Sequence, residues 1–160
     1  MRIDRARGTD RASLGAIARR SHRDSRFYAD PNFPRGRCDD LYERWIANAC
    51  DGDADAVWVA RLGDDAVGYL SGHLDPGGVG RIGLVGVAER ARGQSLGSGL
   101  VGTALAHFAR EGALEARVVT QRRNAGAQAL YERAGFRVES IRPWLHGWFT
   151  GASARVGGLA

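Results

Sequence analysis

Residues 92–99 carry the clearest chemical signal in this sequence. They read Arg-Gly-Gln-Ser-Leu-Gly-Ser-Gly and lie between an apolar run and an amphipathic helical pattern. A strand, a glycine-rich turn and a helix start bring backbone N–H groups and the positive end of a helix dipole to one point. Gly93, Gly97 and Gly99 carry no Cβ, so a bulky anion can approach the main chain. The stretch therefore predicts a phosphate or pyrophosphate site.

Charge and cysteine usage narrow the class of partner. All 23 basic residues are arginine and the formal net charge is +5, and guanidinium forks suit phosphates and carboxylates. The arginines are spread along the chain, so we expect an anionic small molecule and not nucleic acid as the partner. Cys38 and Cys50 fall on one predicted helix roughly 18 Å apart along its axis, which is too far for a disulfide.

Targeting signals are also weak in this sequence. No apolar run approaches the roughly 18–20 residues that span a bilayer. The first residues lack the apolar core of a signal peptide. We therefore expect a cytoplasmic protein with reduced thiols, with no membrane partner and no metal site.

Hydrophobic periodicity predicts a single α/β domain over residues 1–150, with 151–160 as a flexible tail. We expect a mixed central sheet of about seven strands flanked by about four helices. The stretch 23–36 holds aromatics, prolines and a glycine and is predicted as a loop. Strands are predicted at 2–7, 55–62, 66–74, 79–87, 114–120, 136–141 and 143–149, and helices at 10–22, 38–50, 97–111 and 124–134.

Two predictions concern individual helices. Asn124 is a good cap for the last helix, and Gly135 provides its C-terminal stop. In the helix predicted at 38–50, the residues expected to face the core are Leu41, Trp45, Ile46 and Ala49.

Two segments together give the chain a resemblance to the GNAT superfamily of N-acetyltransferases. The first is Val85-Gly-Val87 followed by Arg92 to Leu100, which resembles the family's acetyl-CoA pyrophosphate signature. The second is Asn124 followed by Ala-Leu-Tyr-Glu-Arg-Ala-Gly-Phe at 129–136. The resemblance covers roughly residues 55–149 and implies a GNAT fold, acetyl-CoA as cosubstrate and an amine as acceptor.

The resemblance implies a set of coenzyme-binding residues. N–H groups of the turn would hold the pyrophosphate, while exposed main chain of the strand at 79–87 would pair with pantetheine and stabilise the oxyanion. The alternatives are plain turn geometry for the glycines, a solvated side chain for Arg92 and core packing for the valines. The expected residues are Val85, Val87, Arg92, Gly93, Gln94, Ser95, Leu96, Gly97, Ser98, Gly99, Asn124, Gln128 and Tyr131.

Ser95 stands where the family has a glycine. We expect this position to tolerate ordinary backbone angles, and the serine hydroxyl to be able to donate to a phosphate oxygen.

Tyr131 is the expected catalytic residue, as the general acid that protonates the departing thiolate. Asn124, Gln128 and Tyr131 share one helix face by spacing, and Leu130 is expected on the core side. The alternative for the tyrosine is amphipathic packing. No carboxylate lies in residues 79–87 to act as base, so a water ordered by Glu43, His73 or Asp75 is the expected substitute.

Shorter segments resemble the TDP-fucosamine acetyltransferases, which acetylate an amino sugar carried on a nucleoside diphosphate. They are Ser25 to Pro31, Trp45 to Ala49, Arg81 to Leu84, Val138 to Ser140 and Trp144-Leu. The acceptor site is expected between the loop at 23–36, the second helix and the last hairpin, where Trp144, His146 and Trp148 alternate. The expected substrate-binding residues are Arg26, Phe27, Tyr28, His73 and Trp144.

Several alternatives stay open from the sequence. The acceptor could instead be an aminoglycoside, a polyamine, an amino acid or a peptide N-terminus. The chain could also be a binding module that senses acyl-CoA without turnover. A homodimer is consistent with the resemblance, although no segment marks an interface.

Overall fold

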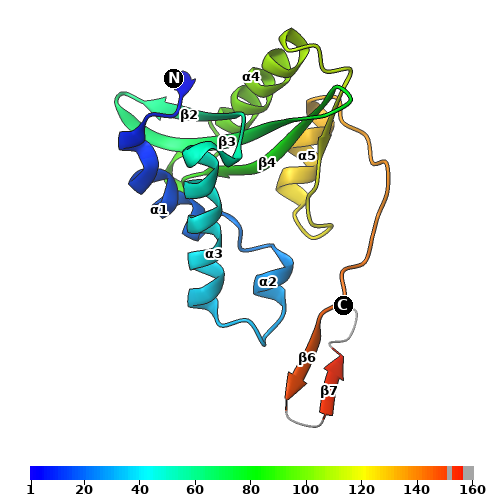
Figure 1. The fold of residues 1–160 in the computed structure, drawn as a ribbon. Coiled ribbons are helices and arrows are strands. Elements are labelled where there is room, and N and C mark those ends of the chain that lie inside the picture. The colour runs from blue at the N-terminus through cyan, green and yellow to red at the C-terminus, as the bar shows by residue number, and fades with distance from the viewer. Residues whose placement is uncertain (151–152, 157–160) are drawn as a thin grey trace.

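The computed structural model describes residues 1–150 and 153–156 (Figure 1). Its main sheet has the strand order β1-β2-β3-β4-β5. Neighbouring strands pair antiparallel except β4 and β5, which are parallel. The predicted α/β class and mixed sheet are confirmed, but this sheet has five strands and not about seven. The strands are β1 (Arg2–Arg5), β2 (Ala56–Leu62), β3 (Asp65–Asp75), β4 (Val79–Val87) and β5 (Glu115–Val118).

Helices cover both faces of this sheet. The α-helices in the described part of the chain are α1 (Arg11–Ser21), α2 (Arg26–Ala29), α3 (Arg35–Asn48), α4 (Leu96–Arg110) and α5 (Ala125–Arg133), one more than expected. The additional helix α2 lies in the stretch predicted as a loop. The sequence does not indicate it, because a helix of four residues is too short to show a periodic pattern. After Pro34, α3 begins three residues earlier than predicted, and a short π-helix follows it at Ala49–Asp53.

The sheet separates two hydrophobic clusters. One lies under α4 and α5 and includes Trp58, Leu70 and Leu100. The other lies under α1 and α3 and includes Val59 and Tyr69. Alternate residues of β2 and β3 therefore serve opposite layers, as a pleated strand requires.

The predicted core face at 38–50 is confirmed at Ile46 and Ala49, which are buried, but the buried stripe of α3 itself differs from the prediction. Cys38, Tyr42 and Ile46 are buried, whereas Trp45 is 38% exposed. The three buried residues are spaced by four, so they form one stripe of the helix. Tyr42 takes the central place because its ring stacks on His22 of the chain after α1, with centroids 4.4 Å apart.

The C-terminal region departs most from the prediction. Residues 136–146 form no strand, and β6 (Gly147–Thr150) pairs with β7 (Ser153–Val156) as a separate antiparallel sheet. The segment before β6 runs away from the main sheet toward the level of α2 (Figure 1). The strand predicted at 136–141 is therefore wrong, and the one predicted at 143–149 is confirmed only at 147–149, within β6. Alternating residues form a strand only where a partner strand is within reach.

The predicted tail is also corrected in part, because residues 153–156 form β7. The remaining tail residues, 151–152 and 157–160, lie outside the described residues. No helix within the described ranges is both long and apolar enough to cross a membrane. Among the same residues, no cluster of three or more potential metal ligands is found.

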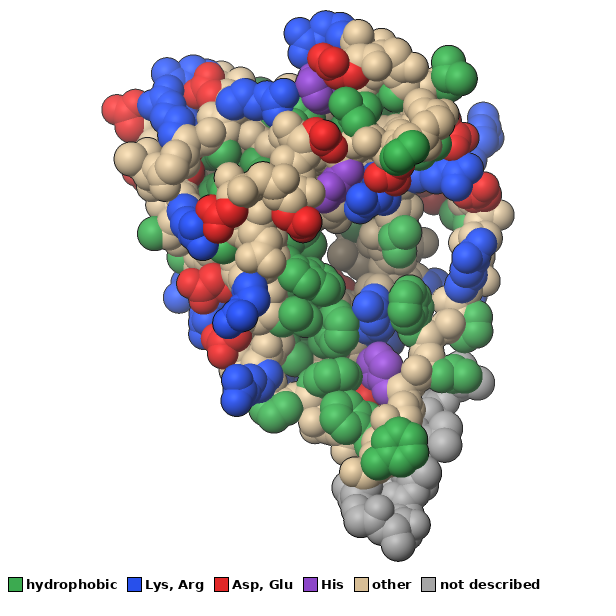
Figure 2. Space-filling model, viewed as in Figure 1, with side chains coloured by type: hydrophobic (Ala, Val, Ile, Leu, Met, Phe, Trp, Pro, Cys, Tyr) green, Lys and Arg blue, Asp and Glu red, His purple; other side chains and the backbone are tan. Residues whose placement is uncertain are grey.

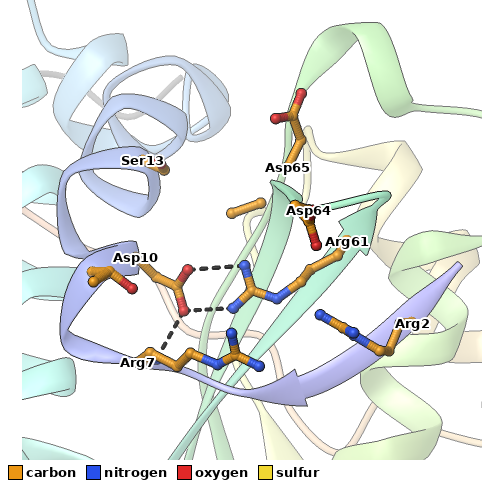
Figure 3. A pocket seen from close by; sticks show the side chains of 9 residues that line it. Arg2, Arg7, Asp10, Ser13, Arg61, Asp64 and Asp65 are labelled. Carbon is orange, nitrogen blue, oxygen red and sulfur yellow. Dashed lines mark hydrogen bonds and ion pairs between the residues drawn. The ribbon is translucent and has the colours of Figure 1, made fainter.

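A buried ion pair ties α1 to the edge of the sheet. The Arg61 guanidinium donates to both carboxylate oxygens of Asp10, at 2.9 and 2.7 Å, and both side chains are buried (Figure 3). This hydrogen-bonded arginine lowers the pKa of Asp10. The pocket around the pair is built from β1, β2 and the start of α1. It therefore lies at the sheet edge opposite the β4–β5 side.

Candidate active site

The turn between β4 and α4 has an unusual backbone. Gly93 has a φ of 76°, and Ser95 has a φ of 57° and a ψ of 14°, the left-handed conformation. Ser95 is the only non-glycine residue with a positive φ in the described chain. The expectation of ordinary backbone angles at this position is therefore wrong. Ser95, the N-cap of α4, keeps the left-handed geometry that glycine would adopt freely.

The N-terminus of α4 has the features of an anion site. No side chain caps it, and its first turn contains no acidic residue. The first helical hydrogen bond runs from the Gly99 N–H to the Ser95 carbonyl at 3.0 Å. The N–H groups of Leu96, Gly97 and Ser98 precede that bond and lie at the positive end of the helix dipole.

Gly99 differs from the expectation that it contacts a phosphate. Its N–H is used within α4, and a Cβ on Gly99 would lie 2.9 Å from Cδ1 of Ile3. Gly99 therefore packs closely against the end of the Ile3 side chain on β1. By contrast, nothing lies within 4 Å of the Cβ position of Gly93.

The two parallel strands separate beside this turn. The ladder between β4 and β5 runs from Val79 to Ile82 and stops there. Pairing of β4 with β3 continues to Val87. Over residues 83–87, β4 therefore has a partner strand on one side only, among the residues that the structure describes.

Two hydrogen bonds show which backbone groups face this open edge. The N–H groups of Leu84 and Ala88 point toward β3, because they donate to Ser71 Oγ and to the Val67 carbonyl, each at 2.8 Å. Backbone groups alternate in direction along a strand, so the N–H groups of Val85 and Val87 point to the open edge. Their side chains pack against the core below α4. The two interpretations of these valines are thus compatible, since binding would use only their main chain.

The side chain of Arg92, a residue of the turn, reaches back to the open edge of β4. Its Nε donates to the Val87 carbonyl at 3.4 Å, a long bond, and the side chain is exposed. The guanidinium therefore lies next to the anion site without a carboxylate partner in the described part of the chain. Gln94 is also exposed, whereas the side chain of Leu96 is buried in the core and leaves only its backbone for a ligand.

Tyr131 lies on α5, which packs against the turn. A Cβ on Gly97 would approach the Leu130 side chain to 3.3 Å, which places the two helices side by side. The Tyr131 side chain is 8% exposed, and burial raises its pKa to about 12. Contrary to the prediction, Tyr131 packs on the same core cluster as Leu130 and Ala134. More than one face of the short helix α5 is therefore in contact with the core.

The other two polar residues of α5 make local contacts. Asn124 caps the helix, because its Oδ1 accepts from the Ala127 N–H at 3.0 Å. This confirms the predicted cap. The Gln128 side chain donates to the Arg122 carbonyl in the loop before α5. A contact of Asn124 or Gln128 with the coenzyme remains a prediction.

Three of the five expected substrate-binding residues lie together. The Arg26 guanidinium carbon lies 4.4 Å from the ring centroid of Phe27 and 4.2 Å from that of Trp144. Trp144 belongs to the segment before β6, which we call the C-terminal arm (residues 137–146). Figure 2 shows a hollow between the side of the molecule formed by α3 and this arm, with hydrophobic side chains along it.

Asp30 fastens the arm to the end of α2. Its Oδ2 accepts from Trp148 Nε1 at 3.0 Å and lies 2.7 Å from His146 Nδ1. Its Oδ1 accepts from the backbone and side chain of Asn32. Hydrogen bonds from Asn32, His146 and Trp148 keep the pKa of this carboxyl far below its usual range.

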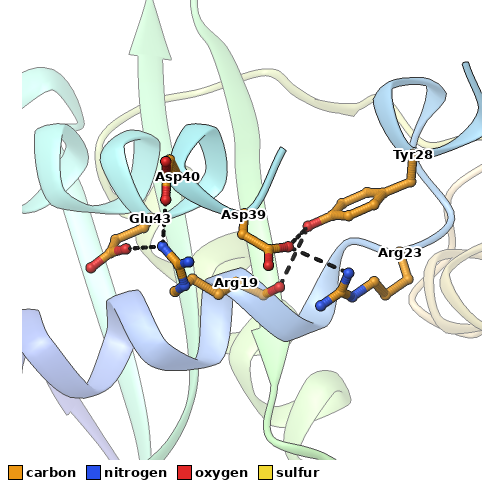
Figure 4. Close-up of polar contacts among 6 residues, drawn as sticks. All are labelled: Arg19, Arg23, Tyr28, Asp39, Asp40 and Glu43. Carbon is orange, nitrogen blue, oxygen red and sulfur yellow. Dashed lines mark hydrogen bonds and ion pairs between the residues drawn. The ribbon is translucent and has the colours of Figure 1, made fainter. Parts of the chain in front are cut away.

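The other two expected residues lie apart from this group. Tyr28 donates its hydroxyl to Asp39, and Arg23 stacks on its ring at 4.8 Å, so it joins the helices of the α1 layer (Figure 4). Burial raises its pKa. The Tyr28 hydroxyl is therefore used within the fold, and a contact of the ring with the acceptor remains a prediction. His73 lies on β3 beside Gly83 at the open edge of β4, and burial lowers its pKa.

Two of the three residues named as possible water-ordering groups, Glu43 and Asp75, form ion pairs with arginines. Glu43 and Asp40 both pair with Arg19, at 2.6 and 2.7 Å (Figure 4). Asp75 pairs with Arg81 at 3.0 Å. His73 is thus the member of the predicted set that carries no such ion pair within the described residues.

Two residues with a role at this site were missed from the sequence. Asp30 precedes Pro31 and gives a turn signal, but its partners lie 116 and 118 positions further along the chain. Ser71 lies in a β-rich stretch with no distinguishing spacing. Only the register of the strands reveals its contact with β4.

Comparisons with known proteins agree with this geometry. A family model described as "Acetyltransferase (GNAT) family" matches residues 19–136. Spore coat polysaccharide biosynthesis protein SpsD of Bacillus subtilis (strain 168) is 27% identical over 139 residues, which cover 87% of this chain and 48% of that protein. The chain thus spans about half the length of this curated relative.

Solved structures share the fold. The PaiA N-acetyltransferase from Thermoplasma acidophilum, in complex with coenzyme A, matches with a TM-score of 0.74 and 18% identity, covering 88% of this chain and 92% of that one. The ribosomal-protein-S18-alanine N-acetyltransferase from Escherichia coli matches with a TM-score of 0.70 and 20% identity, covering 88% and 80%.

Proposed function

Because this chain belongs to the acetyltransferase (GNAT) family, we propose that it is an N-acetyltransferase that moves an acetyl group from acetyl-CoA directly to a primary amine. We further propose that the amine belongs to a nucleotide-linked amino sugar. One observation carries the first proposal. The unpaired edge of β4 ends beside an uncapped helix N-terminus, so that one extended ligand with a diphosphate can contact both.

The coenzyme would bind through main chain at both places. The N–H groups from Gly93 to Ser98 suit the pyrophosphate, and Arg92 adds a positive charge beside them. The amides of the pantetheine arm suit the open edge at Val85 and Val87, as an added strand would. Acetyl-CoA supplies the activated acetyl group as a thioester.

The chain then has a defined task at each step. The Val85 N–H donates to the carbonyl oxygen as negative charge develops there, while the amine nitrogen forms the new C–N bond. The C–S bond breaks, and the Tyr131 hydroxyl gives its proton to the sulfur. Water removes the proton from the amine, since the nearby carboxylates of Glu43 and Asp75 are engaged with arginines.

The acceptor proposal rests on the region between α2 and the C-terminal arm. The Arg26 guanidinium carbon lies close to the ring centroids of both Phe27 and Trp144. A guanidinium presents several N–H donors in one plane, which suits a diphosphate. The exposed ring of Trp144 offers a stacking surface for a base or a sugar. The name of the Bacillus subtilis relative, a polysaccharide biosynthesis protein, supports a sugar-related acceptor. A TDP-linked 4-amino-4,6-dideoxy sugar is the specific acceptor that we propose.

A screen of amines tests both parts. The purified protein is mixed with acetyl-CoA and each amine, and a thiol reagent reports free coenzyme A. The panel contains nucleotide-linked amino sugars, the same sugars without nucleotide, aminoglycosides, polyamines, amino acids and peptides. We expect the highest kcat/KM with a nucleotide-linked amino sugar. Equal rates with the free sugar would refute the acceptor, and no release with any amine would refute the reaction.

Two further proposals concern the setting of the reaction. Both cysteines are free, which supports a reducing compartment such as the cytoplasm. The outer edge of β5 has no partner strand among the described residues, and Val138 and Ile141 of the arm are each 70% exposed. These surfaces support a homodimer that covers them. Analytical ultracentrifugation gives the mass, and a monomer at high protein concentration would exclude the dimer.

A further inference from the structure

A β-bulge lies where β4 separates from β5. Gly72 pairs with Ile82 and Leu70 pairs with Val85, so β3 advances by two residues while β4 advances by three. Ser71 is therefore opposite both Gly83 and Leu84. The ladder to β5 ends at the last residue before this bulge.

The bulge reverses which residues of β4 face the β5 side. Before it, the Gly78 carbonyl accepts from the Leu114 N–H at 2.8 Å, so even-numbered residues face that side. After it, the N–H groups of Leu84 and Ala88 point toward β3. The odd-numbered Val85 and Val87 therefore face the open edge. Without the bulge, the Val85 N–H would point into the β3–β4 ladder.

The bulge is held by a side chain and not only by the backbone ladder. The Leu84 N–H donates to the hydroxyl oxygen of Ser71 at 2.8 Å. Ser71 is 2% exposed, so water does not replace this contact easily. The position opposite must be glycine, because a Cβ on Gly83 would lie 2.7 Å from Ser71 Oγ.

We propose that Ser71 is a positioning residue for acetyl transfer, whose hydroxyl holds the β4 bulge so that the Val85 N–H points at the thioester carbonyl. This inference rests on the proposed function, because it assumes that the acetyl group lies at the open edge of β4. Ser71 itself touches neither substrate. Its effect is on the direction of the Val85 N–H, and so on the polarisation of the carbonyl.

Ser71→Ala tests this inference through the split between binding and turnover. We expect kcat to fall by about 10- to 100-fold, somewhat less than the loss of a complete oxyanion donor. The Kd of coenzyme A, measured by calorimetry, should stay within about threefold, because the pyrophosphate site at α4 is unchanged. Ser71→Thr keeps the hydroxyl and should restore most of the activity. Ser71→Cys, with nearly the native volume and a poor acceptor, replaces Ser71→Ala if that protein does not fold.

An infrared spectrum of bound, isotope-labelled acetyl-CoA gives a readout that is independent of turnover. A hydrogen bond to the carbonyl lowers its stretching frequency. We expect this shift in the wild type and a smaller one in Ser71→Ala and Ser71→Cys. Ser21→Ala is the matched control, since the Ser21 hydroxyl donates to a backbone carbonyl at the same 2.8 Å but in α1. It should leave both kcat and the carbonyl band unchanged.

The outcomes separate this inference from the proposed function. If Ser71→Ala and Ser71→Cys bind coenzyme A and keep the wild-type kcat and carbonyl band, Ser71 has no positioning role. An equal loss in Ser21→Ala would show a general effect of stability and would also overturn it. If the wild type does not bind coenzyme A, the proposed function itself fails.

Discussion

Burial gives Tyr131 the protonation state that its proposed role as general acid requires. Its pKa is raised to about 12 by desolvation, so the phenol keeps its proton throughout the neutral range. A buried phenol gives up its proton only to a nearby group that gains more from the proton than the phenolate loses. A departing thiolate is such a charge.

Replacing Tyr131 with phenylalanine tests this role. We expect Tyr131→Phe to lower kcat by about 10²- to 10⁴-fold, with little change in the Kd of coenzyme A. Because the raised pKa keeps the phenol protonated, the wild-type rate should show no loss from tyrosine ionisation below about pH 11. Steady-state kinetics across pH and calorimetry measure both quantities.

Tyr28→Phe is the matched control for the loss of a phenol. The Tyr28 hydroxyl donates to Asp39 in the α1 layer, so its removal should lower stability and leave kcat unchanged. A protein that only senses acyl-CoA would show no turnover even as the wild type. An unaltered kcat in Tyr131→Phe would remove Tyr131 from the mechanism.

Ser95 has a strained, left-handed backbone in the turn that is proposed to bind the phosphate. A left-handed backbone costs a residue with a Cβ roughly 1 kcal/mol. We expect Ser95→Gly to raise the free energy of unfolding by up to about 1 kcal/mol and to preserve coenzyme binding. Urea denaturation of the coenzyme-free protein measures the change.

Ser98→Gly is the matched control, because it makes the same chemical change within α4. In a helix, glycine is less favourable than serine by about 0.5 kcal/mol, so the free energy of unfolding should fall. A change of the same sign in the free energy of unfolding of both variants would contradict the presence of strain at Ser95.

At the scale of elements, α1 depends on one buried ion pair at the β1–β2 edge. Arg61 is 4% exposed and its partner Asp10 is 8% exposed. Without the Asp10 charge, the buried Arg61 guanidinium keeps, among the described residues, only the longer ion pair with Asp4, at 3.4 Å. We therefore expect Asp10→Asn to lower the free energy of unfolding by about 3 kcal/mol. The exposed pair Arg11–Asp51 is the control, and Asp51→Asn should change stability by less than about 1 kcal/mol.

The same pair sets a dependence of stability on pH. The pKa of Asp10 is lowered in the folded protein, so the folded state binds fewer protons than the unfolded one. This stabilisation is present above the unfolded pKa of about 3.9 and is lost as pH falls through the folded value. Thermal unfolding is measured between about pH 6 and about pH 3, a range that includes that pKa. As the pH falls, the Tm should decrease less in Asp10→Asn than in the wild type. Parallel curves for both proteins would refute the assignment.

At the scale of the whole molecule, the acceptor region is assembled from distant parts of the chain. The C-terminal arm contacts α2 through Trp144 and His146, and Asp30 holds it there. The coenzyme site uses β4, the turn and α4. The two halves of the proposed site therefore rest on different segments and can be perturbed separately.

Asp30→Asn tests this separation. It removes the charge that accepts from His146 and Trp148 and should loosen the arm. We expect the KM for the acceptor to rise about tenfold, a loss typical of one charge-assisted hydrogen bond. The KM for acetyl-CoA should not change. The exposed Asp24 is the control site, and Asp24→Asn should affect neither constant. Equal effects on both KM values would show that the arm supports the coenzyme half as well.

The success of sequence-based prediction followed the range of the interactions. The strand 79–87, the helix predicted at 97–111 and the Asn124 cap agree with the structure to within about one residue. Each depends on neighbours within a few turns. The predicted strand at 136–141 failed and the one at 143–149 was confirmed only at its end, because pairing depends on a partner that no local pattern specifies. The prediction that Trp45 is buried failed for a related reason, since the buried stripe of α3 includes Tyr42, which stacks on His22.

The sequence by itself determined the order of strands and helices as far as α5, apart from the short α2, together with the position of the glycine-rich turn and the resemblance to acetyltransferases. These features are local, because glycine spacing, helix periodicity and capping involve residues close together in the chain. Only the tertiary structure decided the bulge at Ser71, the left-handed Ser95 and the place of the C-terminal arm. Strand register, backbone strain and the docking of the arm all depend on contacts between residues far apart in sequence, whose energies appear only when the chain is folded.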